Sequence, residues 1–320
     1  MATKNGGTVI GIDLGGTNMQ IGVVDAEGRI IGRAKRKTKA ELGLDGVVDR
    51  LVEGVQRACD DAALALDSIA AVGIGVPGAI DVPNGVVLEA PNLGWFDTPI
   101  RKILTDRLGR PVVVDNDVNV AVWGEYVRGA VKGGGDTLGV WVGTGVGGGL
   151  VIDGKLYHGT RFTAGEIGQT WILPGGGPVA RILEHHSSRT AIVDAIDRAL
   201  SQYPDSIMHG VLKENKGKLG SSDVAAAFRE HDPLVIEVVE HAARLLGVAI
   251  ANAVTLLSLQ SVVLGGGMTE ALGDEFVALV KQSFNRAVFP AKLSDCRMVA
   301  TELMDTAGVQ GAALLAGDAA

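Results

Sequence analysis

The stretch "TVIGIDLGGTNMQIGVVDAEGRII", residues 8–31, decides the fold, because its pattern returns later in the chain. Its apolar runs are joined by a turn at Gly15, Gly16 and Thr17 and by a second turn at "DAEG". Short apolar runs separated by glycine-rich turns are typical of consecutive strands. The opening therefore predicts a strand meander rather than a strand followed by a helix.

Residues 137–159, "TLGVWVGTGVGGGLVIDGKLYHG", repeat that order of strand, glycine turn, strand, Asp-Gly turn and strand. A supersecondary unit that recurs in both halves of a chain predicts two related lobes. The length of 320 residues also favours two lobes, because single hydrophobic cores seldom grow beyond roughly 250–300 residues.

Elsewhere, periodicity predicts both helices and buried parallel strands. We expect strands at residues 69–77, 111–117 and 261–267. The expected helices are "GLDGVVDRLVEGVQRACDDAALA", "NVAVWGEYVRGA", "PLVIEVVEHAARLLGVAIANAVTLLSL" and "DTAGVQGAALLAG". The predicted fold class is α/β with mixed sheets.

Composition excludes several classes of protein. The net charge is −8, and the densest basic run, "RAKRKTK" at 33–39, is typical of a solvated strand end. Residues 245–259 are too short and interrupted to span a bilayer, and the N-terminus lacks the apolar core of a signal peptide. Two cysteines, Cys59 and Cys296, argue against a disulfide scaffold. We expect a soluble cytoplasmic protein without nucleic-acid or membrane partners.

Two familiar nucleotide motifs occur without their structural context. The G-x-G-x-x-G pattern begins at Gly73 and again at Gly143, but no helix N-terminus follows to meet a pyrophosphate. Residues 149–156 nearly match a P-loop, yet Leu156 replaces the Ser or Thr that would hold magnesium. NAD binding and a P-loop are therefore rejected.

A different phosphate device remains. "DLGGT" (13–17) and "GTGVGGG" (143–149) are predicted as turns between antiparallel strands, where bare backbone N–H groups approach phosphate oxygens. Thr17 and Thr144 add hydroxyl donors, and Asp13 is suited to orient a hydrated Mg²⁺ ion. The alternative is that both turns are merely tight hairpins.

These residues, with "GVPGAID", "APNLGW", "VVVDNDVNVAVWGE", "AGEIG", "VVLGGG" and "GVQGAALLA", resemble the ROK family (repressors, open reading frames, kinases) over nearly the whole chain. The resemblance implies a two-lobed, actin-like ATPase (ribonuclease H-like) fold with a cleft between the lobes. The expected lobes are residues 1–117 plus 306–320 (small) and 118–305 (large). No helix-turn-helix precedes "VIGIDLGGT", so a kinase is favoured over a repressor.

The resemblance implies that Asp117 is the catalytic base. A carboxylate that accepts the proton of the attacking hydroxyl suits phosphoryl transfer. Asp115 is the rival on the same strand end, and the family pattern decides for Asp117. The structural alternative for Asp117 is a helix N-cap.

The resemblance also assigns the two substrates. The implied sugar ligands are Gly78, Asn92, Asn116, Glu166 and Glu184. The implied ATP and phosphate ligands are Asp13, Gly15, Gly16, Thr17, Thr144 and Gly145, with Gly265, Gly266 and Gly267 on the adenine-ribose side. Each residue alone is more often a loop, cap or strand-end residue.

The chain departs from the family at its structural zinc site. Most ROK kinases hold zinc with the His of "GEIGH" and three cysteines, and Gln169, Gly175, Gly177 and Ile182 stand there instead. None of these is a good zinc ligand, and the adjacent His185 and His186 diverge on a helix. We expect no structural zinc, a segment held by packing of Trp171, Ile172, Leu173, Val179 and Ile182, and an altered sugar contact at Gln169.

The resulting prediction is an ATP- and Mg²⁺-dependent hexose kinase, a glucokinase that phosphorylates O6. Fructose, mannose, allose and an N-acetylhexosamine are alternative acceptors. A non-catalytic sugar-binding regulator is the alternative from another class. Similar proteins are commonly dimers, so a homodimer is expected.

Overall fold

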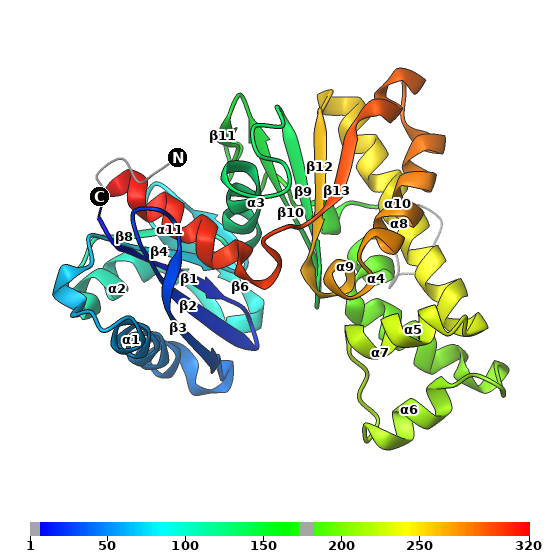
Figure 1. Ribbon diagram of the computed structural model, residues 1–320, viewed down its shortest axis with the longest axis horizontal. Coiled ribbons are helices and arrows are strands. Elements are labelled where there is room, and N and C mark those ends of the chain that lie inside the picture. Colours follow the sequence, from blue (N-terminus) through cyan, green and yellow to red (C-terminus); the bar gives the residue numbers. More distant parts are fainter. Residues whose placement is uncertain (1–6, 173–181) are drawn as a thin grey trace.

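The computed structural model describes residues 7–172 and 182–320, and it has two lobes, each built on a sheet (Figure 1). The chain runs through the first lobe, crosses to the second, and returns to the first with its last helix. The α/β class with mixed sheets, predicted from the sequence, is confirmed.

The first sheet has the strand order β3-β2-β1-β4-β8. It consists of β1 (Val9–Leu14), β2 (Asn18–Val24), β3 (Ile30–Lys37), β4 (Val72–Val76) and β8 (Val112–Asn116). β1 to β3 form the predicted antiparallel meander, with Val9 opposite Val24, while β4 and β8 run parallel to β1. Apolar residues of α1 (Gly43–Asp61) and α2 (Ile100–Leu108) pack against this sheet.

The second sheet repeats that design in the order β11-β10-β9-β12-β13. Its strands are β9 (Thr137–Val142), β10 (Val146–Ile152), β11 (Lys155–Leu156), β12 (Ser261–Gly265) and β13 (Arg297–Ala300). The further helices are α4 (Glu184–Ser187), α5 (Arg189–Ala199), α6 (Met208–Glu214), α7 (Ser221–Arg229), α8 (Pro233–Leu257), α9 (Gly266–Leu272) and α10 (Asp274–Ala287). Antiparallel β9, β10 and β11 confirm the predicted repeat.

Two glycine segments differ from their predicted structure. Only residues 143–145 form the turn of "GTGVGGG", and Gly147 to Gly149 belong to β10, where a Cβ on Gly147 would lie 2.5 Å from Val118. Gly266 and Gly267 begin α9 instead of ending a strand. Both errors have one cause: glycine also serves close packing inside elements, which local sequence does not reveal.

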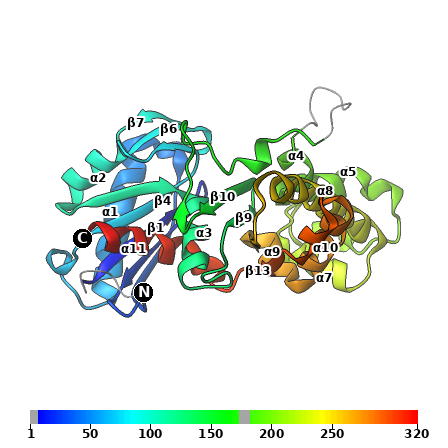
Figure 2. The ribbon, with the colours of Figure 1, turned by 90° about the horizontal axis from the view of Figure 1, so that it is seen from above.

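A third sheet, of β5 (Ala79–Asp81), β6 (Val86–Ala90) and β7 (Trp95–Thr98), was not predicted. Its strands are short, with three to five residues each, so they carry little periodicity. β5 follows β4 in the chain and contacts β8, so this sheet extends the first lobe beside those two strands. Figure 2 shows β6 and β7 on the side of the lobe where α2 lies.

Two helices are exchanged between the lobes. α3 (Asp117–Val127) follows β8 of the first sheet, yet Val118 and Val122 lie against β10 and β9 of the second. α11 (Ala307–Ala319) follows β13 of the second sheet and lies on β1 and β4 of the first (Figure 1). A Cβ on Gly11 would lie 1.9 Å from the Val309 carbonyl oxygen, so β1 and α11 are in close contact.

We propose the expected boundaries for the lobes, residues 1–117 plus 306–320 and residues 118–305. They follow the packing, because α3 begins at residue 117 and lies on the second sheet, whereas α11 begins at residue 307 and lies on the first. Within residues 7–172 and 182–320, every helix is too short or too polar to cross a membrane.

Candidate active site

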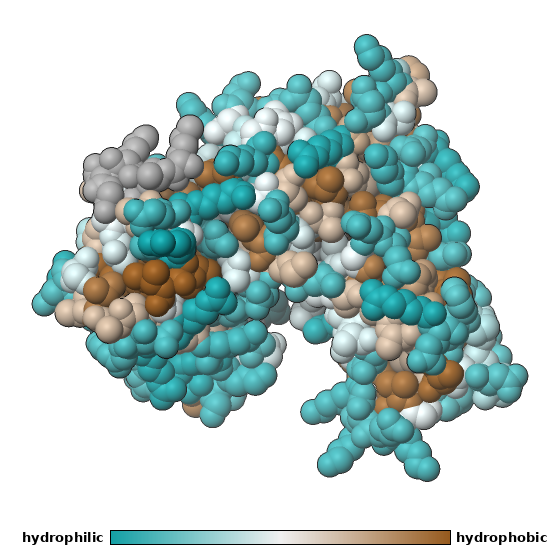
Figure 3. All heavy atoms as spheres, in the orientation of Figure 1, coloured by the Kyte–Doolittle hydropathy of each residue, from teal (hydrophilic) through white to brown (hydrophobic). Residues whose placement is uncertain are grey.

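A cavity of about 290 Å³ opens between the lobes, and Asp13 and Asp117 both line it. The space-filling view shows the molecule hollowed where the lobes meet (Figure 3). Asp13 lies near the end of β1, and Asp117 is the first residue of α3. The exchanged helix α3 therefore carries a carboxylate from the first sheet's edge into the space between the sheets.

Both carboxyl groups bind their protons more tightly than usual. Burial raises the pKa of Asp117 to about 7, and the neighbouring Asp13 and Glu166 carboxylates add to the shift. Burial also raises the pKa of Asp13 to about 6, with a further contribution from Asp305. Raised pKa values at facing carboxylates in a cleft are typical of functional sites.

The structure separates Asp115 from Asp117. Asp115 is 2% exposed, and its carboxylate is fully engaged by Asn116 N–H at 2.7 Å, Asn119 Nδ2 at 3.0 Å and His158 Nε2 at 2.7 Å. Asp117 accepts the Val118 N–H at 2.9 Å and faces the cavity. Asp115 therefore positions the strand end, and Asp117 is the carboxylate open to a substrate.

Asn116, rather than Asp117, caps α3. Its Oδ1 accepts the N–H groups of Val118 at 2.8 Å and Asn119 at 3.0 Å. Its Nδ2 donates to the Gly78 carbonyl at 3.0 Å, which brings two of the predicted sugar ligands together. Gly78 has φ +101°, and a Cβ there would lie 2.1 Å from the Glu89 carbonyl oxygen, so a side chain is excluded.

Thr38, the residue that follows β3, makes two hydrogen bonds to the hairpin of residues 15–17. The hydroxyl of the buried Thr38 donates to the Gly15 carbonyl at 2.6 Å, and the Thr38 N–H donates to the Thr17 carbonyl at 2.8 Å. Asn92 lies beside this turn, 3.4 Å from the Cβ position of Gly16. Neither a positive φ nor a steric clash requires glycine at position 16, which favours a role for its exposed backbone.

The matching hairpin, residues 143–145, is fastened to the corner between α4 and α5. Glu184 Oε2 accepts the Val146 N–H at 2.8 Å and lies 2.3 Å from the Cβ position of Gly145, so a side chain there would displace the Glu184 carboxylate. The Arg189 N–H donates to the Gly143 carbonyl at 2.8 Å, and Arg189 Nη2 donates to the Thr144 hydroxyl at 2.9 Å. A predicted sugar ligand and a predicted phosphate hairpin are thus in contact.

Glu166 and Glu184 are neighbours, since Glu184 contributes, after desolvation, to the raised pKa of Glu166. Gln169 is exposed at the end of a 3-10 turn, Ile167–Gln169, and its N–H donates to the Glu166 carbonyl at 3.1 Å. The backbone of Gln169 is therefore hydrogen-bonded to the backbone of Glu166, a predicted sugar ligand.

The segment that lacks the zinc ligands lies partly outside the described residues, including Leu173, Gly175, Gly177 and Val179. Its described ends are joined by a Leu183 N–H bond to the Thr170 carbonyl at 3.0 Å and by a β-bridge between Trp171 and Ile182. Trp171 is 63% exposed, so the prediction that it anchors the segment by burial is wrong. Ile172 packs against the core as expected.

Gly265 and Gly266 lie beside the 143–145 hairpin at the end of β12. Gly265 pairs with Trp141, and a Cβ on Gly265 would lie 2.4 Å from the Trp141 ring. Gly266 has φ +82° and packs on the Val142 backbone. Packing alone therefore accounts for glycine at both positions, and their predicted contact with the nucleotide stays a prediction.

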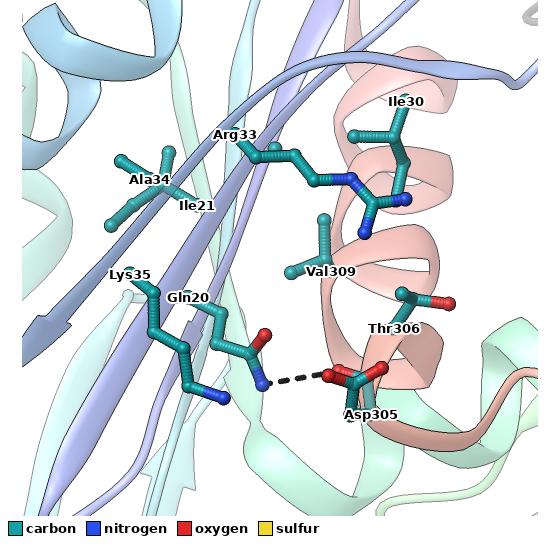
Figure 4. A pocket seen from close by; sticks show the side chains of 10 residues that line it. Gln20, Ile21, Ile30, Arg33, Ala34, Lys35, Asp305, Thr306 and Val309 are labelled. Carbon is teal, nitrogen blue, oxygen red and sulfur yellow. Dashed lines mark hydrogen bonds between the residues drawn. The ribbon is translucent and has the colours of Figure 1, made fainter.

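A second cavity of about 210 Å³ adjoins the first and shares Gln20 and Asp305 with it. Figure 4 shows Lys35 and Gln20 pointing toward Asp305, with Gln20 Nε2 donating to the Asp305 carbonyl at 3.1 Å. The Lys35 charge lowers the pKa of Asp13, opposing the effect of burial. β3 thus contributes a cation beside the carboxylates.

The predicted residues lie in three groups, and Asp13 and Asp117 of the first group line the cavity between the lobes. The first lobe and the start of α3 supply the first group: Asp13, Gly15, Gly16, Thr17, Gly78, Asn92, Asn116 and Asp117. The second lobe supplies the second group: Thr144, Gly145, Glu166, Gln169 and Glu184. The third group, Gly265 and Gly266, adjoins the second. Sequence reasoning missed Thr38, His158 and Arg189. A lone Thr, His or Arg without a motif gives no local signal.

Three comparisons with known proteins agree. The family model described as "ROK family" matches residues 9–319. The chain is 31% identical over 307 residues to a glucokinase of Halalkalibacterium halodurans, covering 94% of this chain and 92% of that protein. It is 30% identical over 311 residues to a glucokinase of Thermotoga maritima, covering 95% and 96%.

A crystal structure of a ROK family glucokinase from Streptomyces griseus, in complex with glucose and AMPPNP, superimposes with a TM-score of 0.87. The sequences are 32% identical, and the match covers 97% of this chain and 99% of that one. With 97% of this chain matched, that likeness extends over both lobes.

Proposed function

The chain belongs to the ROK family, and on that premise we propose that it is an ATP-dependent glucokinase, which transfers the γ-phosphoryl group to O6 of glucose. The observation that carries the proposal is the pair Asp13 and Asp117, which line one cavity. Asp13 and Trp141, which also lines the cavity, each stand two residues before a glycine hairpin. Relatives about 30% identical over nearly the full length support the same activity.

Asp117 is proposed as the base. As the sugar oxygen bonds to the γ-phosphorus and the bond from that phosphorus to the bridging oxygen of ADP breaks, the hydroxyl proton moves to the Asp117 carboxylate. A base with a pKa near the working pH is ionised in enough molecules to accept the proton and is basic enough to hold it. Burial raises the pKa of Asp117 to about 7, which meets this requirement. Its position at the start of α3 is fixed by the Asn116 cap.

The two hairpins are proposed to hold the phosphates through the backbone of Gly15, Gly16 and Gly145 and the hydroxyls of Thr17 and Thr144. Positioning and charge stabilisation supply most of the rate in phosphoryl transfer, because the protein does little covalent chemistry. Closure of the lobes would exclude water that otherwise hydrolyses ATP. Gly265 and Gly266 are proposed to border the nucleotide beside the second hairpin.

Mg²⁺ is the proposed metal cofactor. The donor set fits a hydrated hard cation, because the cavity is lined by the carboxyl groups of Asp13, Asp117, Glu270 and Asp305. Burial, followed by repulsion from neighbouring carboxylates, raises the pKa of the first three. Asp13 would hold the ion through water. When bound, the ion neutralises charge on the phosphates.

For the sugar we propose Gly78, Asn92, Asn116, Glu166 and Glu184 as ligands. The carboxylates of Glu166 and Glu184 offer acceptors for adjacent hydroxyls of the sugar. Gln169 adjoins them, because its N–H donates to the Glu166 carbonyl. Fructose, mannose, allose and an N-acetylhexosamine present overlapping sets of hydroxyls, so they stay as alternative acceptors. We also propose a homodimer and a cytoplasmic location, by resemblance to the family.

A coupled assay of ADP release over a panel of these sugars tests the proposal. We expect turnover with glucose to exceed turnover with each alternative. A non-catalytic sugar-binding regulator is the rival: it would release no ADP with any sugar, while glucose would still raise the Tm through binding to the folded state.

A further inference from the structure

The start of α5 places an arginine on the second hairpin. Arg189 is bound to this hairpin twice, through its N–H to the Gly143 carbonyl at 2.8 Å and through Nη2 to the Thr144 hydroxyl at 2.9 Å. The Thr190 hydroxyl adds a bond to the Thr144 carbonyl at 2.8 Å. The guanidinium is therefore held beside the hydroxyl that is proposed to bind phosphate.

Within the described part of the chain, Arg189 has a hydroxyl and no carboxylate as the partner of its guanidinium. Among residues 7–172 and 182–320, its guanidinium forms no ion pair with a carboxylate. In a chain of net charge −8, a cation without a carboxylate partner beside a ligand hairpin favours an anionic ligand.

The hydrogen bond between Arg189 and Thr144 also orients the hydroxyl. Arg donates and does not accept, so the Thr144 oxygen is the acceptor and its own proton remains available for another acceptor. The guanidinium keeps further N–H donors in a planar fork that matches phosphate oxygens. The two side chains thus present adjacent donors to one anion.

We propose that Arg189 is a phosphate ligand of the donor nucleotide, binding the triphosphate together with Thr144 and the Gly145 backbone. This inference rests on the proposed kinase function, because it takes the 143–145 hairpin as the phosphate site. It adds a charged ligand to a set that otherwise consists of hydroxyl and backbone groups on the second lobe.

The test uses Arg189→Met, which keeps an apolar stem, Arg189→Lys, which keeps the charge, and Arg198→Ala as a control that removes one positive charge from the same helix. We expect Arg189→Met to raise the KM for ATP about tenfold to a hundredfold, the loss typical of a charge-assisted hydrogen bond. The KM for glucose should change less than about twofold, and Arg189→Lys should recover part of the loss.

Binding measurements separate this role from a structural one. Titration with AMPPNP should show the same loss of affinity in Arg189→Met, and inorganic tripolyphosphate should become a weaker competitor of ATP by a similar factor. Adenosine, which has no phosphate, should bind equally to the wild type and the variant. A purely structural clamp on the hairpin would instead raise the KM of both substrates and weaken adenosine as well.

The outcomes also distinguish the inference from the function beneath it. An Arg189→Met enzyme whose KM for ATP and affinity for AMPPNP match those of Arg198→Ala overturns the inference and leaves the kinase intact. A wild type that phosphorylates no sugar, yet binds AMPPNP through Arg189, overturns the kinase and supports the phosphate ligand. Comparison of the Tm values verifies that each variant is folded.

Discussion

The Asp13 carboxylate lies close enough to Asp117 to raise the pKa of that carboxyl group, although the two residues come from different ends of the first lobe's chain path. β1 delivers one carboxylate and the start of α3 delivers the other. Two negative carboxylates in one cavity repel each other, so a proton or a cation between them stabilises the site.

Asp117→Asn should abolish turnover while preserving sugar binding. The amide is similar in size and still accepts the Val118 N–H, so the start of α3 should keep its geometry. It cannot accept the hydroxyl proton, and loss of a base typically lowers the rate about 100-fold to 10,000-fold. Steady-state kinetics and glucose-induced shifts in Tm check this; activity within tenfold of the wild type would exclude Asp117 as the base.

Asp13→Asn should stabilise the ligand-free protein at alkaline pH. The folded-state pKa of Asp13 is raised from 3.8 to about 6, so ionisation between these values costs stability as the pH rises. Below pH 3.8 Asp13 is protonated in both the folded and the unfolded protein, so the Tm of the variant should match that of the wild type. Near pH 8 the Tm of the variant should be several degrees higher. Asp318→Asn, an exposed control, should show no such pH-dependent difference; equal Tm values for Asp13→Asn and wild type at pH 8 would contradict the prediction.

His158→Ala should lower stability by about 1–3 kcal/mol, because it removes a partner from the buried Asp115 carboxylate. The hydrogen bond to Asp115 raises the pKa of His158, so its contribution is fully present below the unfolded value of about 6.5 and is lost as the pH rises through the folded value. Urea unfolding at pH 6 and pH 9 checks this. The loss should be larger at pH 6, and His209→Ala, on an exposed histidine, is the control.

Glu125→Ala should be the most damaging of these substitutions. Glu125 is fully buried and accepts the N–H groups of Ala130 at 2.7 Å and Leu303 at 2.8 Å, and the Thr301 hydroxyl. It thereby ties the end of α3 to the segment that leads into α11. Leaving these buried donors without an acceptor should cost about 3 kcal/mol or more, measured by denaturant unfolding against the exposed control Glu240→Ala. A loss equal to the control's would remove Glu125 from that role.

Purified protein should contain no stoichiometric zinc, since Gln169 and Ile182 stand at two of the family's ligand positions and glycines stand at the others. Elemental analysis measures this directly, and one zinc per chain would refute it. A chelator should accordingly leave the Tm unchanged in the absence of added metal.

Gln169→His should alter the KM for glucose more than the KM for ATP, because residue 169 adjoins Glu166.

The sequence predicts the repeated strand units well, because alternation of apolar runs with glycine turns is a local property. It does not predict that Gly147 to Gly149 lie within β10, since Gly147 and Gly149 make room for α3 and Gly148 for the Gly165 backbone, and these contacts exist only in the folded state. The three short strands of the third sheet carry too few residues for a periodic signal.

Among the site residues, the sequence places Asp117 at the end of a strand, whereas in the structure β8 ends at Asn116 and Asp117 begins α3. The alternative that Asp117 is the helix cap names the wrong neighbour, because Asn116 is an equally good cap residue. His158 and Arg189 escape prediction for a different reason. Their partners, Asp115 and Thr144, are more than 40 residues away, and such pairings are set by tertiary packing.

The exchange of α3 and α11 makes the chain resemble a domain-swapped dimer contained in one polypeptide. Each duplicated half supplies the final helix of the other, and a Cβ on Gly311 of α11 would lie only 1.6 Å from the Val120 carbonyl of α3, so the two helices are interlocked at that point. Neither half is a self-sufficient module. Expression of residues 1–130 or 131–320 alone would leave each sheet without its partner's helix, while co-expression of the two fragments would restore both.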